Sequence, residues 1–352
     1  MNLFDYIRPA TLPEAIAAGA RPGASYLAGG TALLDLMKIG VAHPGQVVDI
    51  SRLPGLDRIE RLDDGAIRIG ALVRNADLAR DPGFAAACPA VAEALLSGAS
   101  AQVRNAATLA GNLMQHTRCA YFQDPHSACN RRNAGAGCDA IGGETRGHAV
   151  LGWSDACIAT HPSDFAVPLV ALDAVVEIAG PDGPRDMPLA DFYALPDATT
   201  PGGVTLAPGE LITALRLPPE AAGFAANARY VKLRERTSFA FALVSAAAML
   251  RIEDDRIAAA RVALGGVAAR PWRSSAAEAA LIGATPGTDI FETAADLMVK
   301  GAAASGDNGF KIALARRITT RALTLAAAGT PARMPALPAS VFAPVTGTAS
   351  HA

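Results

Sequence analysis

The sequence predicts an α+β protein of about two domains. Its 352 residues exceed the roughly 150 residues of an average domain. In residues 223–330, strand-like stretches come first and alanine-rich helical stretches follow, which is typical of an α+β domain. A stretch rich in proline and glycine at residues 180–225 separates this part from residues 1–222, so we expect the boundary near residue 222. Residues 331–352, rich in Pro, Ala and Thr, are expected to lack fixed structure.

The composition excludes several classes of protein. Half of the residues, 51%, are hydrophobic, which is enough for a large core. No window reaches the roughly 18 apolar residues of a membrane span. With a net charge of −2 and no basic tract, nucleic acid is not an expected partner. The first residues lack the basic and apolar regions of a signal peptide, so we expect a cytoplasmic protein or one exported with a partner that carries the signal.

The N-terminal third alternates short strands and helices. A strand is expected at residues 4–7, and a helix opens at Thr11, a capping residue, with Pro13 in its first turn. A second strand runs into Gly29-Gly30-Thr31, and an amphipathic helix follows. Glycines at such a turn let a ligand approach the backbone, and the free N–H groups there suit a phosphate. A plain tight turn is the alternative interpretation.

Further elements are predicted along the chain. Strands are expected at residues 46–50, 66–69, 71–73, 229–234 and 257–264, and helices at residues 76–79, 89–96, 276–282, 291–299 and 309–327. Residues 165–176 should hold a strand and a helix, and residues 180–209 a hairpin tip, a short helix and a linker. Cys88 lies in an apolar stretch and is expected to be a buried structural thiol.

A second small polar turn, residues 104–112, contains Thr108, Gly111 and Asn112. Polar groups with little bulk suit contact with a ribose or a pyrophosphate, and two such turns in one domain favour a nucleotide cofactor. Asp164, in the run His161-Pro-Ser-Asp164, is able to accept from a ribose hydroxyl. For His161 we expect a surface or capping role.

Four of the five cysteines fall in one stretch, residues 119–157, which we call the cysteine segment. Its glycines, asparagines and proline favour turns, and apolar periodicity is nearly absent from residues 123–146. Something else must order it, and an iron–sulfur cluster held by the four thiolates is the sharpest hypothesis. Zinc, which favours paired Cys-x₂₋₄-Cys knuckles, disulfides and four unrelated cysteines are the alternatives. Arg118, Arg131, Arg132 and Arg146 would offset the charge of a cluster, or lie on a solvated surface.

These motifs resemble a known family. Tyr26-Leu-Ala-Gly-Gly-Thr-Ala-Leu-Leu34, Arg104-Asn-Ala-Ala-Thr-Leu-Ala-Gly-Asn112 and His161-Pro-Ser-Asp164 resemble the FAD-binding subunits of molybdenum hydroxylases, which include the xanthine dehydrogenases and aldehyde oxidoreductases. The resemblance covers nearly the whole chain except about the last twenty residues. It implies a vanillyl-alcohol-oxidase-type (PCMH-type) FAD-binding domain of two α/β subdomains, followed by a C-terminal α+β domain like that of the carbon monoxide dehydrogenase flavoprotein.

The resemblance also implies the residues that contact FAD. The loop that would cradle the pyrophosphate comprises Tyr26, Leu27, Ala28, Gly29, Gly30, Thr31, Ala32, Leu33 and Leu34. Thr108, Gly111 and Asn112 would flank the phosphates and flavin, and Asp164 the ribitol or ribose. Lys232 would lie near the isoalloxazine, and Ile212 is a weaker candidate for adenine contact.

A subset of this family carries a cysteine-containing insertion that binds a [4Fe–4S] cluster. By this resemblance, residues 115–157 are the insertion, and Cys119, Cys129, Cys138 and Cys157 are the ligands. The implied complex is a heterotrimer with a large molybdopterin-binding subunit and a small [2Fe–2S] subunit, and the implied function is electron transfer from an aldehyde oxidoreductase to an external acceptor. Oxygen, a quinone, a ferredoxin-like protein and NAD are all open as acceptors. The alternatives are the β subunit of a 4-hydroxybenzoyl-CoA reductase and a free-standing flavoprotein oxidase. No catalytic residue set is evident in the chain.

Overall fold

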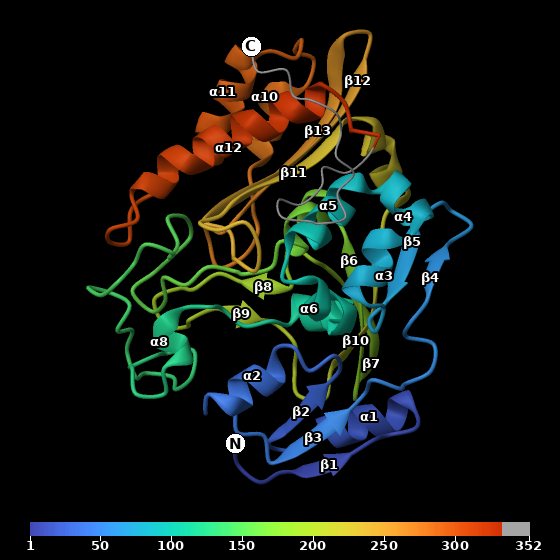
Figure 1. Cartoon of the computed structure of the whole chain (residues 1–352), viewed down its shortest axis with the longest axis vertical. Helices are drawn as coiled ribbons and strands as arrows, with labels where there is room; N and C mark the ends of the chain where they lie inside the picture. The colour runs from blue at the N-terminus through green and yellow to red at the C-terminus, as the bar shows by residue number, and fades with distance from the viewer. Residues whose placement is uncertain (333–352) are drawn as a thin grey trace.

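The computed structural model describes residues 1–332. It contains three main sheets, stacked along the long axis of the molecule (Figure 1). The first is parallel, with strand order β1-β3-β2, and the second and third are antiparallel, with orders β4-β5-β10-β6-β7 and β11-β12-β13-β14. Helices and sheet are thus mixed throughout, which confirms the predicted α+β class.

The first sheet and its two helices form the N-terminal end. The elements are β1 (Asp5–Ile7), α1 (Leu12–Gly19), β2 (Ala24–Leu27), α2 (Leu33–Lys38) and β3 (Gln46–Asp49). The predicted start of α1 is confirmed, because Thr11 and Glu14 form a reciprocal capping box with Pro13 in the first turn. The predicted passage from strand through glycines to helix is likewise observed between β2 and α2.

The second sheet carries most of the remaining helices of residues 1–222. Its strands are β4 (Ile59–Arg61), β5 (Ile67–Gly70), β6 (Val175–Gly180), β7 (Gly183–Pro188) and β10 (Leu211–Leu217), and β8 (Tyr193–Ala194) pairs with β9 (Gly203–Val204) beside it. The helices are α3 (Asn75–Arg80), α4 (Pro82–Ala87), α5 (Pro89–Ser97), α6 (Ala101–Ala106), α7 (Leu109–Leu113), α8 (Ala120–Gln123) and α9 (Ala166–Ala171).

Three local predictions are wrong. Residues 71–73 form a turn rather than a strand, since the N–H of Ala71 bonds to Thr213 and that of Leu72 to Leu56. Residues 180–209 hold no helix, because their prolines and glycines instead support the β6–β7 hairpin and the β8–β9 pair. Residues 108–112 are the cap and body of helix α7 rather than an open turn, because the Thr108 side chain accepts from the N–H of Gly111.

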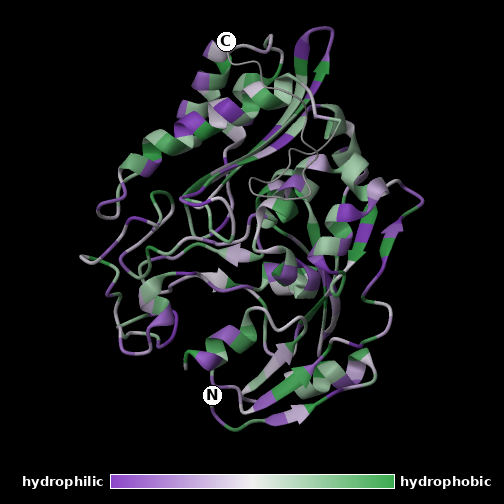
Figure 2. Ribbon diagram, in the orientation of Figure 1, coloured by the Kyte–Doolittle hydropathy of each residue, from purple (hydrophilic) through white to green (hydrophobic). Residues whose placement is uncertain are grey.

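The third sheet is covered on both faces. After the 3₁₀-helix η1 (Pro219–Asn227) come β11 (Ala228–Leu233), β12 (Val244–Glu253), β13 (Arg256–Gly265), β14 (Trp272–Arg273), α10 (Ser275–Leu281), α11 (Thr288–Met298) and α12 (Phe310–Ala327). Ala246, Ala248 and Leu250 pack on the side of α10–α12, while Ala247 and Met249 join the core beneath α5 and α9. Alternation along a strand sends neighbours to opposite faces, so both faces of β12 are buried. In Figure 2, α12 shows both hydrophobic and hydrophilic bands, as expected of a helix with one buried face.

The cysteine segment lies outside these layers. Apart from the short helix α8, it consists of turns, and it occupies one side of the molecule between α2 and the start of α12 (Figure 1). Cys88 lies in the main core, 2% exposed, and burial raises the pKa of its thiol to about 12. The prediction of a buried structural thiol there is confirmed. The prediction for residues 331–352 falls almost entirely outside the described residues.

Candidate functional site

A cavity of about 670 Å³ lies where several segments that are far apart in the sequence meet. Its wall combines Thr31 and Ala32 of the glycine turn, residues 103–112 of α6 and α7, the start and end of the cysteine segment, Asp164, and residues 235–243 between β11 and β12. We call it the large cavity. Its volume is within the usual range of small-molecule and cofactor sites.

The glycine turn between β2 and α2 leaves donors free beside this cavity. Within the described residues, the backbone N–H groups of Gly29, Gly30, Thr31 and Ala32 donate to no other protein group. Gly30 has a φ of +74°, a conformation that glycine adopts without strain. Successive free N–H groups in such a turn form a concavity that binds anions. This arrangement suits a pyrophosphate.

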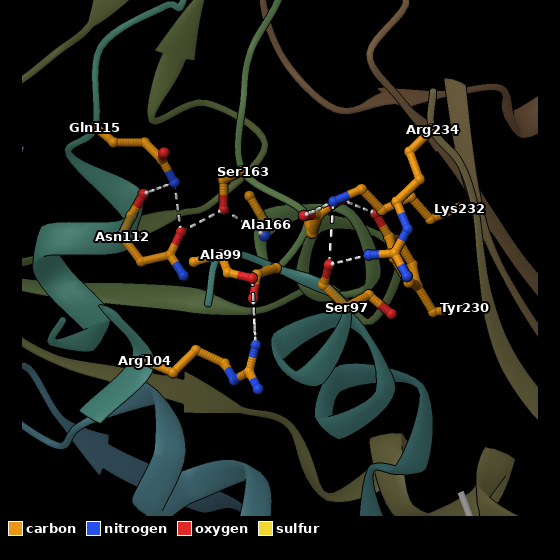
Figure 3. A network of polar contacts seen from close by, with 12 residues as sticks. Ser97, Ala99, Arg104, Asn112, Gln115, Ser163, Ala166, Tyr230, Lys232 and Arg234 are labelled. Carbon is orange, nitrogen blue, oxygen red and sulfur yellow. Dashed lines mark hydrogen bonds and ion pairs between the residues drawn. The ribbon is translucent and has the colours of Figure 1, made fainter. Parts of the chain in front are cut away.

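The neighbouring wall is formed by α7 and fixed by a side-chain network. Asn112 Oδ1 accepts hydrogen bonds from Gln115 Nε2 at 2.6 Å and from Ser163 Oγ at 2.7 Å (Figure 3). The Asn112 carboxamide therefore has its orientation set, with Nδ2 as the donor left over. Helix α7 and residue 163, far apart in sequence, thus form one wall.

A buried ion pair lies beside this network. Lys232 Nζ is 2.7 Å from Asp164 Oδ2, and their side chains are only 3% and 9% exposed. Lys232 also donates to the carbonyl of Ser97 at 3.1 Å (Figure 3). The Tyr230 hydroxyl donates to Asp164 Oδ1 at 2.5 Å. Burial, with the Asp164 carboxylate next to it, raises the pKa of Tyr230 well above its ordinary value, so the hydroxyl stays a donor. The Asp164 carboxylate is held rigidly at the cavity wall.

The structure therefore brings most of the sequence-predicted cofactor residues to one place. Thr31, Ala32, Gly111, Asn112 and Asp164 line the large cavity directly. The other residues of the glycine turn are half-buried next to it, Thr108 caps α7, and Lys232 is fixed to Asp164. Ile212 lies apart from them, 2% exposed in the main core on β10, and does not line the cavity. Its contact with adenine stays a prediction.

Sequence reasoning missed two sets of wall residues. Arg104 is 8% exposed, lines the cavity and donates to the carbonyl of Gly98 at 2.6 Å. Residues 235–243 form the wall opposite, where the Phe241 ring packs beneath the Arg118 guanidinium at 5.2 Å. Arg104 lies inside a motif that was noted for its small residues. Residues 235–243 contain no sequence motif that predicts a site, and only the tertiary fold brings them to the cavity.

All four cysteines of the cysteine segment line a second, small cavity, which we call the cysteine cavity. It is about 10 Å³, roughly the space of one water molecule. Cys129 and Cys138 face each other as a β-bridge, and Ser154 and Cys157 form another. Cys119 and Thr117 line both cavities, so the two cavities adjoin.

The sulfur atoms carry hydrogen bonds from nearby donors. Cys157 Sγ accepts from Arg131 Nε at 3.2 Å and from the N–H of Ala159 at 3.5 Å, and Cys119 Sγ lies 3.2 Å from His148 Nε2. Burial raises the pKa of Cys119 to about 11. None of the five cysteines forms a disulfide. Among residues 1–332, no group of three or more His, Cys, Asp or Glu side chains is spaced to hold a metal ion.

His161 lies between Thr160 and Pro162, which line the large cavity, and it differs from the predicted surface role. It is partly buried, its ring packs against Tyr193 with centroids 4.3 Å apart, and Nδ1 accepts weakly from the N–H of Ser163. Within the described residues, its Nε2 is buried without a hydrogen-bond partner. Burial lowers the pKa of His161 to about 3.

This histidine predicts a pH dependence of stability. Between pH 3 and about 6.5, the ordinary pKa of histidine, the unfolded chain binds a proton here that the folded chain does not, so the free energy of unfolding should fall as the pH is lowered. In His161→Phe this contribution is absent, so the stability of the wild type relative to His161→Phe should fall as the pH is lowered. Urea unfolding at pH 4.5 and 7 measures it. Parallel curves for the two proteins would contradict the prediction.

Comparison with known proteins agrees with this geometry. Residues 2–220 match the family model of the FAD-binding domain in molybdopterin dehydrogenase, and residues 229–326 match the carbon monoxide dehydrogenase flavoprotein C-terminal domain. The chain belongs to the FAD-binding subunits of the molybdopterin dehydrogenases. The resemblance found in the three sequence motifs is thereby confirmed, and the protein is an FAD-binding oxidoreductase subunit.

Similar members of this family match over nearly their whole length. The aldehyde oxidoreductase FAD-binding subunit of Escherichia coli K12 is 47% identical over 330 residues, covering 93% of this chain and 99% of the relative. The carbon monoxide dehydrogenase medium chain of Hydrogenophaga pseudoflava is 27% identical over 330 residues, covering 92% and 96%.

Solved structures show the same fold. A carbon monoxide dehydrogenase from Hydrogenophaga pseudoflava superposes with a TM-score of 0.72 at 28% identity, covering 93% of this chain and 98% of that one. Quinoline 2-oxidoreductase from Pseudomonas putida 86 gives 0.71 at 26% identity with the same coverage. Within the described residues, no helix is long and apolar enough to cross a membrane.

Proposed function

We propose that the protein is the electron-transfer subunit of a molybdenum-containing aldehyde oxidoreductase, with a [4Fe–4S] cluster in addition to FAD. The substrate class is supported by the 47% identity to an aldehyde oxidoreductase FAD-binding subunit over almost the full chain. The single observation that carries the second cofactor is the common position of four cysteines around one cavity that adjoins the large cavity. Residues 1–222 and 223–330 would be the two domains, in line with the two family matches.

The large cavity is the proposed FAD site. The free N–H groups of the turn within Tyr26–Leu34 would hold the pyrophosphate, with Gly111 and the Asn112 carboxamide beside it. The Asp164 carboxylate, which is paired with Lys232, would accept from a hydroxyl of the ribitol or ribose, and Lys232 would add positive charge near the isoalloxazine. Bound FAD would accept electrons one at a time from single-electron carriers and would release two electrons together to an acceptor.

The cysteine cavity is the proposed cluster site, with Cys119, Cys129, Cys138 and Cys157 as ligands. Four thiols and no carboxylate on one wall match the thiolate preference of an iron–sulfur cluster. Because the open volume is only about 10 Å³, the cysteine segment has to open around a cluster.

The surroundings of the cysteines suit a negatively charged group. Arg131 and the N–H of Ala159 already donate to Cys157 Sγ, and such hydrogen bonds stabilise thiolate charge. Arg132 instead donates to the carbonyls of Tyr121, Phe122 and Ser127, so it fixes the loop rather than the sulfurs. A large molybdopterin-binding subunit and a small [2Fe–2S] subunit are the proposed partners in a heterotrimer, which would deliver electrons to an external acceptor.

Cys129→Ser tests the cluster. The purified wild-type protein should show flavin absorbance and about four irons per chain, whereas Cys129→Ser should lose iron and cluster absorbance while keeping FAD. Cys88→Ser, which changes a cysteine in the main core, is the matched control and should keep both. A wild-type protein with flavin but no iron would overturn the cluster. If Cys129→Ser loses the iron but the enzyme complex still turns over at the wild-type rate, the cluster would have only a structural role.

A further inference from the structure

His148 stands at the boundary between the two cavities. It is 7% exposed and lines the large cavity, while its Nε2 lies 3.2 Å from Sγ of Cys119. Cys119 in turn is the one cysteine of the cysteine segment that lines both cavities. The contact between His148 and Cys119 therefore joins a side chain of the large-cavity wall to a cysteine of the cysteine cavity.

The direction of the hydrogen bond follows from the chemistry of the sulfur. A ligand thiolate has no proton to donate, so the imidazole nitrogen facing it has to be the donor. His148 would then carry its proton on Nε2, and Nδ1, which is buried without a partner among the described residues, would carry the lone pair. A neutral histidine in this tautomer puts one N–H on Cys119 Sγ.

The backbone of His148 is held from the C-terminal part of the chain. Its carbonyl accepts from Lys311 Nζ at 2.7 Å and from Asn308 Nδ2 at 3.1 Å, and both donors are fully buried. Lys311 also donates to the carbonyls of Gly147 and Gly266, and so connects the cysteine segment to the third sheet. Because its backbone is fixed in this way, the His148 side chain is pre-organised, and it loses little conformational entropy when it orients toward Cys119.

We propose that His148 is a positioning residue that holds Cys119 at the shared wall of the two cavities and stabilises negative charge on its sulfur through Nε2–H. This inference rests on the proposed [4Fe–4S] cluster. Hydrogen bonds to the sulfur ligands raise the reduction potential of such a cluster, because reduction adds negative charge that the donors stabilise. Cys157 has donors from Arg131 and Ala159, whereas His148 is the side-chain donor for the cysteine that adjoins the FAD site.

The test measures the midpoint potential of the cluster in the purified protein. The cluster's paramagnetic signal is recorded during a redox titration to obtain this potential. His148→Leu should keep about the wild-type iron content and shift the reduction equilibrium about tenfold toward the oxidised form, which equals about 59 mV for one electron. His148→Gln, which keeps an N–H donor at similar reach, should restore most of the shift. His126→Leu, a change to an exposed histidine of the same segment, is the matched control and should leave the potential unchanged.

The outcomes separate this inference from the proposed function. A wild-type protein without iron would overturn both. An iron-loaded His148→Leu protein with the wild-type potential would overturn the role of His148 alone. If His148→Leu loses iron but His148→Gln keeps iron and potential, the N–H donor positions Cys119, as proposed. Equal loss of iron in both variants would show that the donor is not what matters, and would overturn the inference.

Discussion

Asp164→Asn is expected to destabilise the protein by about 3 kcal/mol, because it leaves the buried ammonium of Lys232 without its counter-charge. In the variant, Lys232 would have two acceptors left among the described residues, the carbonyl of Ser97 and the new carboxamide, and neither carries a negative charge. The measurement is the free energy of unfolding in urea. FAD content should fall as well, since Asp164 lines the cavity that we assign to the cofactor.

The double variant Asp164→Asn/Lys232→Met separates the two effects. Removing both charges takes away the unpaired ammonium, so the double variant should recover most of the stability lost in Asp164→Asn. FAD binding should stay weak, because the carboxylate is still missing from the cavity wall. A double variant that is less stable than Asp164→Asn would contradict this account of the ion pair. Full recovery of FAD would show that Asp164 does not contact the cofactor.

Gly29→Ala is expected to weaken FAD binding at least about tenfold, a loss within the 1–3 kcal/mol that overpacking costs. A Cβ at this position would lie 2.1 Å from the carbonyl oxygen of Ala106, which is backbone and is not free to rotate away. The glycine turn would have to move off the 106–107 segment, and its free N–H groups would move with it. Titration of the FAD-free protein with FAD, followed by flavin fluorescence, measures the affinity.

Gly45→Ala is the matched control for this substitution. A Cβ there meets no atom within 4 Å, and Gly45 lies at the opposite end of the neighbouring strand from the turn. Gly45→Ala should therefore bind FAD as the wild type does. If Gly29→Ala also binds FAD normally, the turn does not need to approach the 106–107 backbone closely, and its assignment as the pyrophosphate cradle would have to be abandoned.

Local sequence signals were sufficient where one short stretch determines the structure. The capping box of Thr11 and Glu14 and the strand–glycine–helix passage at residues 24–38 were predicted close to their observed bounds. In both cases the decisive groups lie within a few residues of each other. The prediction at residues 71–73 was wrong because their N–H groups bond to Thr213 and Leu56, which no local pattern reveals.

The candidate site divides in the same way. Its small polar turns and its four clustered cysteines are visible in the sequence, because each is a local run of unusual composition. The sequence also indicated that the cysteine segment has no apolar face of its own. It gave no sign of what holds that segment in the protein, which the structure shows to include Lys311 and Asn308 from more than 150 residues further along the chain.

Short runs of residues were enough to predict the family, the mixed helix and sheet class, and the residue types available to FAD and to the proposed cluster. How these residues meet could be learned only from the folded protein, which pairs Asp164 with Lys232, forms a wall from residues 235–243 and places Cys119 on both cavities. The physical reason is that turns and caps depend on neighbouring residues. Buried ion pairs and cavity walls depend instead on which distant surfaces the core brings together.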